Sequence, residues 1–247
     1  MKRPSGVGAF FDVDKTILAE NSGTAYLKSL YERGEIDWKA VLLGLGTYLR
    51  YKLNLLDIER WVERNGVQFR GRSEASLAQE AAELFRKVLL PSVYPEAHER
   101  VRWHLAQGHL VALVSGATKF VLEPLAAHLG VKHMLCTLLE THEGVFTGRV
   151  VRPICFGEGK IYWIQQLIER ESVDLARSYF YTDSITDLPL LDLVGHQVVT
   201  NPDPFLYRTA VRRRWPVRFF VPPPKRRIAD PPADVLADAA EYPVDGS

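Results

Sequence analysis

Asp12 and Asp14 follow a short apolar run near the N-terminus, with only Val13 between them. We expect residues 10–13 to form a buried strand, which places both carboxylates where that strand ends. Two carboxylates this close repel each other and raise each other's pKa, so they do not serve the stability of a core. A divalent cation or a shared proton-transfer step would account for them. The pair therefore predicts phosphate, metal or nucleophile chemistry at this strand end.

Polar residues also follow later segments that are predicted as strands. Residues 110–114 are an apolar run that ends at Ser115, and residues 178–182 are another that ends at Asp183. Continuous apolar runs of this length are typical of strands buried on both faces of a parallel sheet. Because ligands bind at the carboxyl ends of such strands, we expect these side chains to converge with the first aspartate pair.

The residue types at these strand ends suit phosphoryl transfer. The carboxylate oxygens of Asp12, Asp14 and Asp183 are hard ligands of the kind that Mg²⁺ prefers. The Ser115 hydroxyl can bind a phosphoryl oxygen, and Lys160, at a predicted helix start, supplies a fixed positive charge. Asp12 could attack phosphorus. Asp14 could protonate the leaving alcohol and later take a proton from water.

The chain resembles the haloacid dehalogenase superfamily of phosphatases, in the branch that contains phosphoserine phosphatase. The resemblance rests on four segments in the family order, which are residues 12–16, residues 114–116, Lys160 and residues 182–187. It implies a Rossmann-like core, an Mg²⁺-dependent aspartyl-phosphate mechanism and a helical cap that selects the substrate.

The same resemblance implies a role for each matching position. Asp12 would be the nucleophile and Asp14 the general acid and base. The metal site would comprise Asp12, Asp14 and Asp183 with the Val13 backbone carbonyl, supported by Asp187 and Thr16, and the phosphoryl group would be held by Ser115, Gly116 and Lys160.

The chain departs from the family pattern at several uncharged positions. Lys15 stands where many relatives have Gly, and Thr186 where they tend to have Asn. Phosphoserine phosphatase uses an acidic residue just after the first motif to bind the serine amine, whereas here Glu20 is offset by one and Asn21 lies in register. Every charged motif position is present, so we expect activity. Phosphoserine, histidinol phosphate and a lysophospholipid remain open as substrates.

The pattern along the chain predicts an α/β fold, with a Rossmann-like parallel sheet, an inserted helical-bundle cap and a small β-hairpin. Helical periodicity runs for about seventy residues after the first motif, and strands alternate with helices from residue 95 onward. The predicted parts are a discontinuous core at residues 1–20 and 91–221, a cap at residues 21–90, a hairpin within residues 135–151 and a Pro-rich disordered tail at residues 222–247.

Within the predicted cap, Ser22 and Asp57 are expected to cap helices. The aromatic residues Trp38, Tyr48 and Trp61 are expected to form the core of the cap. Alternatively, some of this apolar surface contacts a lipid-like or aromatic substrate.

Composition excludes some other classes. Hydrophobic residues make up 47% of the 247 residues and charged residues 25%, which is ordinary for a globular protein. The net charge is +1, so the protein has no overall positive potential that would attract nucleic acid. Cys136 and Cys155 have no metal-ligand spacing and fit a reducing compartment. We see no signal peptide and no membrane span, so a cytoplasmic location is expected.

Two rivals to a hydrolase share the same residues. A phosphotransferase would pass the phosphoryl group from the same intermediate to another alcohol. A phospho-acceptor or binding protein, such as a signalling receiver domain, would not turn over, although receivers carry no helical cap. Small phosphorylated molecules are the expected partners, and basic residues within 212–227 could contact an anionic membrane surface.

Overall fold

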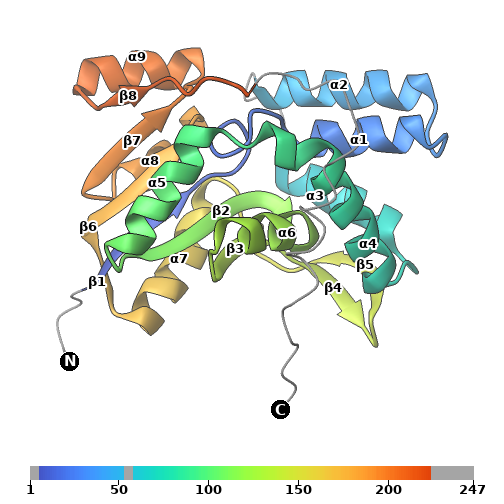
Figure 1. The fold of residues 1–247 in the computed structure, drawn as a ribbon. Coiled ribbons are helices and arrows are strands. Elements are labelled where there is room, and N and C mark those ends of the chain that lie inside the picture. Colours follow the sequence, from blue (N-terminus) through green and yellow to red (C-terminus); the bar gives the residue numbers. More distant parts are fainter. Residues whose placement is uncertain (1–5, 53–57, 224–247) are drawn as a thin grey trace, which may run out of the picture.

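The computed structural model describes residues 6–52 and 58–223. Within them, a six-stranded sheet lies at the centre, with strand order β3-β2-β1-β6-β7-β8 (Figure 1). Each neighbouring pair in this sheet is parallel, which confirms the predicted α/β class. The strands are β1 (Gly6–Phe11), β2 (Leu110–Thr118), β3 (His133–Thr137), β6 (Val173–Thr182), β7 (His196–Thr200) and β8 (Val217–Arg218).

Helices cover both faces of the sheet because successive strand residues point to opposite sides. In β2, Val111 and Leu113 belong to a buried cluster with residues of α5 and α6. Ala112 and Val114, which alternate with them, belong to a second cluster with residues of α7, α8 and α9. The bounds of these helices are α5 (Pro95–Ala106), α6 (Lys119–Leu129), α7 (Glu158–Glu171), α8 (Leu188–Leu191) and α9 (Pro204–Arg213).

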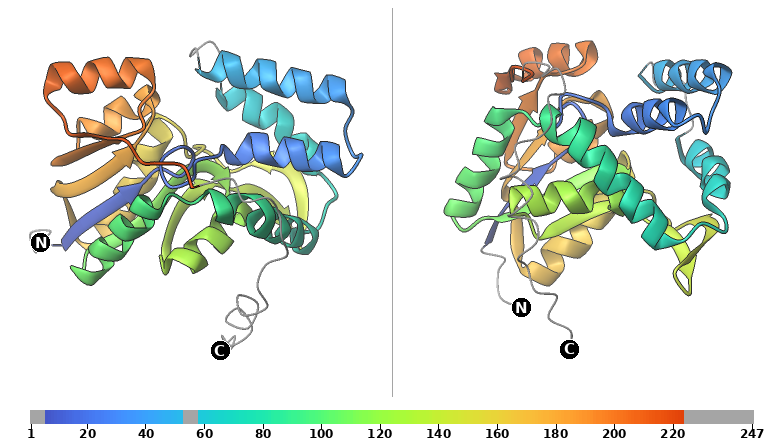
Figure 2. Two further views of the ribbon diagram at one scale, coloured as in Figure 1. Left: turned by 45° about the horizontal axis from the view of Figure 1, so that its top comes forward. Right: turned by 45° about the vertical axis from the view of Figure 1, so that its right-hand side comes forward.

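Residues 21–90, here called the helical insert, connect β1 to α5. Both views of Figure 2 show its first three helices lying together to one side of the sheet, while its last helix contacts α6. The cap boundaries at residues 20 and 91 stay a prediction. Its elements are α1 (Ser22–Glu32), α2 (Trp38–Lys52), α3 (Ile58–Gly66), a 3-10 turn (Val67–Phe69), α4 (Glu74–Leu84) and a π-helical turn (Phe85–Leu89). A second 3-10 turn (Leu90–Ser92) joins the insert to α5.

The hairpin is shorter than the sequence indicated. It consists of β4 (Leu139–His142) and β5 (Val145–Val150), which pair antiparallel. Glu143 and Gly144 form its two-residue turn with φ values of 50° and 75°, the left-handed conformations that a type I′ turn needs. The expectation that residues 135–137 belong to the hairpin is wrong. They lie in β3, which pairs with β2 in the central sheet.

The hairpin packs against the helical insert. Phe146 of β5 is 2% exposed and packs edge-to-face against Phe120, with ring centroids 5.5 Å apart. Leu77 and Ala81 of α4 complete this buried cluster. The cluster therefore joins the insert, the hairpin and α6 of the core.

Some predictions concern residues outside the described part of the chain. They are the helix N-cap at Asp57, the tail beyond residue 223 and the basic residues at 225–227. None of the described helices is long and apolar enough to span a membrane.

Candidate active site

The predicted strand ends meet at one edge of the sheet. Asp12 directly follows β1, and its backbone N–H continues the ladder by donating to the Tyr181 carbonyl at 2.9 Å. Asp183 directly follows β6, and Ser115 lies within β2. All three of these polar side chains are buried and line the same cavity. The parallel sheet therefore brings together residues that are far apart in sequence.

Lys160 of α7 joins two of the aspartates. Its Nζ lies 2.7 Å from Oδ1 of Asp12 and 2.8 Å from Oδ2 of Asp187. The Thr182 hydroxyl also donates to Oδ2 of Asp187 at 2.6 Å. Lys160 and Asp187 are 3% and 1% exposed, so this is a buried group of one cation and two carboxylates. The sequence placed Lys160 at this site but did not reveal Thr182 as a donor, although it directly precedes Asp183 in the fourth motif.

Burial decides the proton affinities of these groups. Burial raises the pKa of Asp12 to about 8, against the lowering effect of Lys160. Burial alone would lower the pKa of Lys160, but Asp12 and Asp187 outweigh it and hold that pKa above its usual range. Lys160 therefore stays charged, while the raised pKa of Asp12 shows that burial disfavours its carboxylate even beside this one cation.

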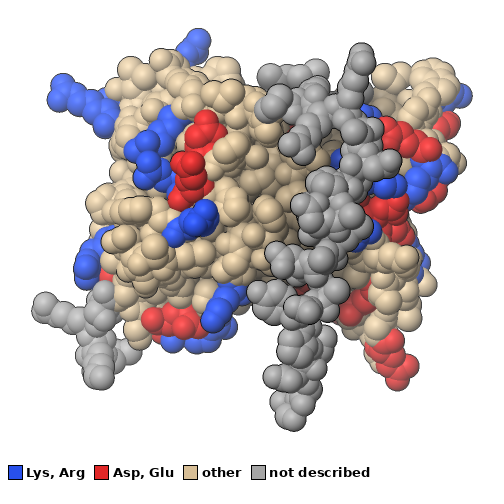
Figure 3. Space-filling model, viewed as in Figure 1, with Lys and Arg blue, Asp and Glu red and all other residues tan. Residues whose placement is uncertain are grey.

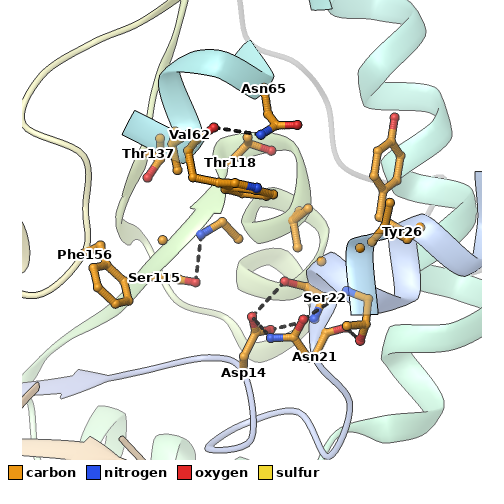
Figure 4. Close-up of a pocket in the computed structure, with 18 of the residues that line it drawn as sticks. Asp14, Asn21, Ser22, Tyr26, Val62, Asn65, Ser115, Thr118, Thr137 and Phe156 are labelled. Carbon is orange, nitrogen blue, oxygen red and sulfur yellow. Dashed lines mark hydrogen bonds between the residues drawn. The ribbon is translucent and has the colours of Figure 1, made fainter. Parts of the chain in front are cut away.

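Asp14 is bound to the first turn of α1 (Figure 4). Its Oδ1 accepts from the Ser22 backbone N–H at 2.9 Å. Its Oδ2 accepts from Asn21 Nδ2 at 3.0 Å and from the Ser22 hydroxyl at 3.1 Å. Burial raises the pKa of Asp14, and the hydrogen bonds from Ser22 partly offset that rise. A carboxylate is favoured here because the N-terminus of a helix presents unpaired N–H groups.

The residue that caps α1 differs from the predicted one. Asn21, and not Ser22, is the N-cap, because its Oδ1 accepts from the Thr24 backbone N–H at 3.0 Å. The amide of Asn21 thus links the helix start to Asp14. In the sequence, Asn21 lies in register with the acidic residue that binds the serine amine in phosphoserine phosphatase. In the structure, Asn21 caps α1.

Ser115 and Gly116 lie at an irregularity in β2. Ser115 pairs with Cys136, but the next pairing joins Thr118 to Thr137, so the register shifts between them. The Ser115 hydroxyl accepts from the Ala117 backbone N–H at 3.1 Å. Irregular pairing of this kind turns side chains and backbone groups out of the ladder. Ser115 and Gly116 both line the cavity, as a phosphoryl-binding segment must.

Two residues of the first motif have structural roles. Lys15 has a φ of 65°, the left-handed region in which Gly is unstrained. This conformation suits the Gly that the family resemblance implies at this position. Thr16 is 1% exposed and is not one of the described residues that line the cavity. Its predicted supporting role is therefore not direct contact with a ligand in the cavity.

The predicted metal ligands fit Mg²⁺ by type but do not form a metal-binding cluster in this structure. Among the described residues, no three carboxylate, imidazole or thiol groups are placed to hold an ion. Asp14 is turned toward α1, and the Val13 carbonyl, an expected ligand, accepts from the N–H groups of Ile17 and Leu18 at 2.9 Å. Asp187 Oδ1 is buried without a hydrogen-bond partner in the described part of the chain. The oxygen-only donors suit a hard cation.

A cavity of about 540 Å³ lies above these strand ends. Figure 4 shows Val62 and Asn65 of α3 on the side of the cavity opposite Asp14 and Ser22. The helical insert therefore supplies the wall that faces the carboxylates.

The aromatic residues predicted for the core of the cap lie elsewhere. Trp38 is 58% exposed, and Trp61 is 38% exposed and lines the cavity. The expectation that both are core residues is wrong. The alternative, that apolar cap surface faces a ligand, fits the position of Trp61. The side chain of Tyr48 lies outside the described part of the structure.

Charges on the outer surface are mixed. On the face shown in Figure 3, basic and acidic side chains lie among one another around a largely uncharged centre. At the strand ends, by contrast, Asp12, Asp14, Asp183, Asp187 and Lys160 line one cavity, and Lys160 contacts two of these aspartates.

Comparisons with known proteins found similar sequences and structures. A sequence model of haloacid dehalogenase-like hydrolases matches residues 9–192. A protein of Mycobacterium tuberculosis named probable phosphatase is 34% identical over 237 residues, which cover 94% of this chain and 82% of that protein. A phosphoserine phosphatase of the same organism is 32% identical over 216 residues, which cover 86% of this chain and 70% of that protein.

A solved structure has the same arrangement of the chain. It is a protein of unknown function from Bordetella pertussis Tohama I, which matches with a TM-score of 0.78 and 33% sequence identity. The match covers 87% of this chain and 99% of that one.

Proposed function

This chain belongs to the haloacid dehalogenase-like hydrolase family and is a phosphatase of that family, and from this premise we propose an Mg²⁺-dependent phosphomonoesterase that acts through an aspartyl-phosphate on Asp12. The observation that carries the proposal is the contact of Lys160 with Asp12 and Asp187 at the edge of the cavity. This contact holds Oδ1 of the buried Asp12, and it supports a role for the Lys160 ammonium group in binding the phosphoryl group.

In the first half-reaction, a carboxylate oxygen of Asp12 attacks phosphorus. Lys160 binds Oδ1, so we assign the attack to Oδ2. As the new bond from Oδ2 to phosphorus forms, the bond from phosphorus to the ester oxygen breaks. Asp14, in its protonated form, gives its proton to that ester oxygen and the alcohol leaves. Burial of Asp14 raises its pKa, which favours the form that this step needs.

In the second half-reaction, water replaces the alcohol. The Asp14 carboxylate takes a proton from the water as its oxygen attacks phosphorus. The bond from phosphorus to Asp12 breaks, which releases inorganic phosphate and restores both carboxyl groups. The Ser115 hydroxyl and the Gly116 backbone hold the phosphoryl oxygens in both steps, and Lys160 balances their charge.

The carboxylates of Asp12, Asp14 and Asp183 would hold Mg²⁺. The ion would supply positive charge that offsets the negative charge of these carboxylates and of the phosphoryl group. Asp14 would have to exchange a hydrogen bond with Ser22 or Asn21 to reach it, because both of its oxygens are bound to the start of α1.

A panel of phosphomonoesters with and without Mg²⁺ tests this function. We expect release of phosphate with Mg²⁺ and a loss of activity after treatment with EDTA. Free alcohol and phosphate should appear in equal amounts. Alcohol in excess of phosphate in the presence of glycerol would indicate transfer to an acceptor in place of hydrolysis. A single stoichiometric release without turnover would indicate a phospho-acceptor.

A further inference from the structure

We propose that the substrate is a phosphomonoester of an uncharged, apolar alcohol whose chain extends from Ser115 along the helical insert to the cavity mouth at Leu43. This inference rests on the proposed function, because it places the ester's phosphoryl group at Asp12. It specifies the class of alcohol, which the chemistry at the strand ends leaves open.

The cavity is much larger than a phosphoryl group requires. Its volume of about 540 Å³ lies within the range of roughly 300–1,000 Å³ that encloses organic ligands. The strand ends occupy only one side of it. The remaining space is enclosed by the helical insert and α6, so the alcohol of the substrate would fill it.

The charges that line the cavity all lie at the phosphoryl end. Among the described lining residues, the charged ones come from the strand ends and their flanking segments, and they are Asp12, Asp14, Lys15, Lys160, Asp183 and Asp187. The described lining residues of the helical insert carry no charge. An ammonium or carboxylate group on the alcohol would lose its hydration there without gaining an opposite charge, which is costly.

Glu20, the residue considered for binding a serine amine, is not one of the described residues that line the cavity. Arg72 is a cation of the insert that contacts a lining residue, since it donates to the Tyr26 hydroxyl at 3.2 Å. It is already paired with Glu80. Glu20 is therefore not placed to bind an ammonium group of the alcohol, and Arg72 is not free to bind a carboxylate group.

Apolar side chains form much of the wall, alongside uncharged polar ones such as Asn65 and Gln68. Leu77, Ala81 and Leu84 of α4 are all at most 5% exposed and line the cavity, as does Phe120 of α6. Val62 of α3 also lines the cavity, on the side opposite Asp14 (Figure 4). Each methylene of a ligand placed between these residues leaves water for an apolar contact, which strengthens binding.

The mouth of the cavity is also apolar. Leu43 lines the cavity yet is 73% exposed, and Trp61 lines it as well. Exposed apolar side chains that together border a cavity are typical of a ligand-binding surface. A chain that reaches from the strand ends to Leu43 would cover both. The shape and polarity of the space thus fit an amphiphilic ester with its phosphate inside and its apolar end at the mouth.

Turnover of n-alkyl phosphates from ethyl to octyl tests this inference. We expect kcat/KM to rise roughly threefold to fourfold for each added methylene until the chain reaches the mouth, from the burial of apolar surface. Propyl phosphate should exceed phosphoserine, which has the same three-carbon skeleton with two charges, by at least thirtyfold. Comparing kcat/KM for 2-naphthyl phosphate with kcat/KM for octyl phosphate shows whether the cavity prefers a ring-shaped or a chain-shaped alcohol. No dependence on chain length, or a preference for phosphoserine, would overturn the inference.

A matched pair of variants tests the position of the chain. Leu43→Gln should lower kcat/KM for octyl phosphate at least fivefold more than for ethyl phosphate. Leu42→Gln is the control, because Leu42 is the adjacent residue of α2, is 56% exposed and does not line the cavity. It should leave both values within twofold. Equal effects of the two variants on octyl phosphate would contradict the assigned path.

Calorimetry separates failure of this inference from failure of the proposed function. If every ester is hydrolysed without regard to its alcohol, the proposed function stands and the inference fails. If no ester is hydrolysed, the proposed function fails, and the affinities of propyl and octyl phosphate for the intact protein decide the ligand class. Octyl phosphate binding at least tenfold more tightly supports the inference, and equal affinities overturn it.

Discussion

Asp14 accepts a hydrogen bond from the backbone N–H of Ser22 at 2.9 Å, which attaches a carboxylate of the core to the first turn of the helical insert. The proposed general acid and the wall that faces the substrate are therefore parts of one connected structure. A movement of α1 would change the environment of Asp14, and a ligand that draws Asp14 away would release the start of α1.

Removing the Ser22 hydroxyl tests this connection. Ser22→Ala deletes the bond from Oγ to Asp14 at 3.1 Å and keeps the backbone bond. We expect kcat to fall about threefold to tenfold, as the loss of one hydrogen bond to a charged group permits. Ser76→Ala, a hydroxyl of the insert outside the cavity lining, is the control and should keep kcat. An unchanged kcat in Ser22→Ala would argue against a catalytic role for this contact.

Lys160 should matter for stability as well as for activity. Lys160→Met leaves Asp12 and Asp187 buried without their shared cation, and breaking such a group costs about 3–5 kcal/mol. Urea denaturation at pH 7 would measure this loss. Because burial raises the pKa of Asp12, a proton can replace the missing cation there, and the deficit relative to the native protein should shrink as the pH falls. A deficit that is the same at pH 5 and pH 8 would contradict this explanation.

Binding of Mg²⁺ can be measured without turnover. We expect millimolar Mg²⁺ to raise the melting temperature of the native protein, because an ion that binds only the folded state stabilises it. Asp183→Asn removes one negative ligand and should reduce that increase by more than half. Asp174→Asn, an aspartate on β6 that does not line the cavity, should leave it unchanged. Equal increases in melting temperature in all three proteins would show that Mg²⁺ does not bind at Asp183.

His104 predicts a pH dependence of stability that is separate from catalysis. Its side chain is fully buried, and its ring nitrogens lie 2.9 Å from the Tyr181 hydroxyl and 2.8 Å from His109 Nδ1. Burial, together with the positive fields of His109 and Arg100, lowers the pKa of His104 to about 4.

Because this folded-state pKa lies below the ordinary value, protonation of His104 opposes folding. The stability that neutral His104 contributes is present above pH 6.5 and is lost as the pH falls toward 4, by on the order of 3 kcal/mol. Denaturation between pH 4 and 7.5 should show a steeper loss in the native protein than in His104→Gln. Parallel curves would show that His104 does not titrate in this range.

The sequence predicted the convergence of Asp12, Ser115 and Asp183 because parallel strands align their carboxyl ends, a property of the fold class. It also predicted Lys160 at the same site, from its place in the motif order. It could not predict that Asp14 binds Ser22 and Asn21, because that contact depends on where α1 begins in space. Asn21 and Ser22 are adjacent and both have cap-forming side chains, so residue type does not decide which of them caps α1.

The errors in the cap and the hairpin have a common cause. Periodicity shows that a residue is apolar and which face it shares, but not what covers that face. Trp61 has the spacing of a core residue and lies at the cavity, and residues 135–137 have the pattern of a strand without indicating β2 as its partner. Neighbours distant in sequence decide both outcomes.

Asp12 is the residue on which the proposed mechanism depends, and Asp12→Asn tests it most directly. The variant keeps the size of the side chain and leaves the pair of Lys160 with Asp187 intact, so circular dichroism should show the native fold. With Mg²⁺ and an aryl phosphate, we expect phosphate release to fall at least a thousandfold, because an amide does not attack phosphorus. Folded Asp12→Asn protein that retains more than about a tenth of the native rate would contradict an aspartyl-phosphate mechanism on Asp12.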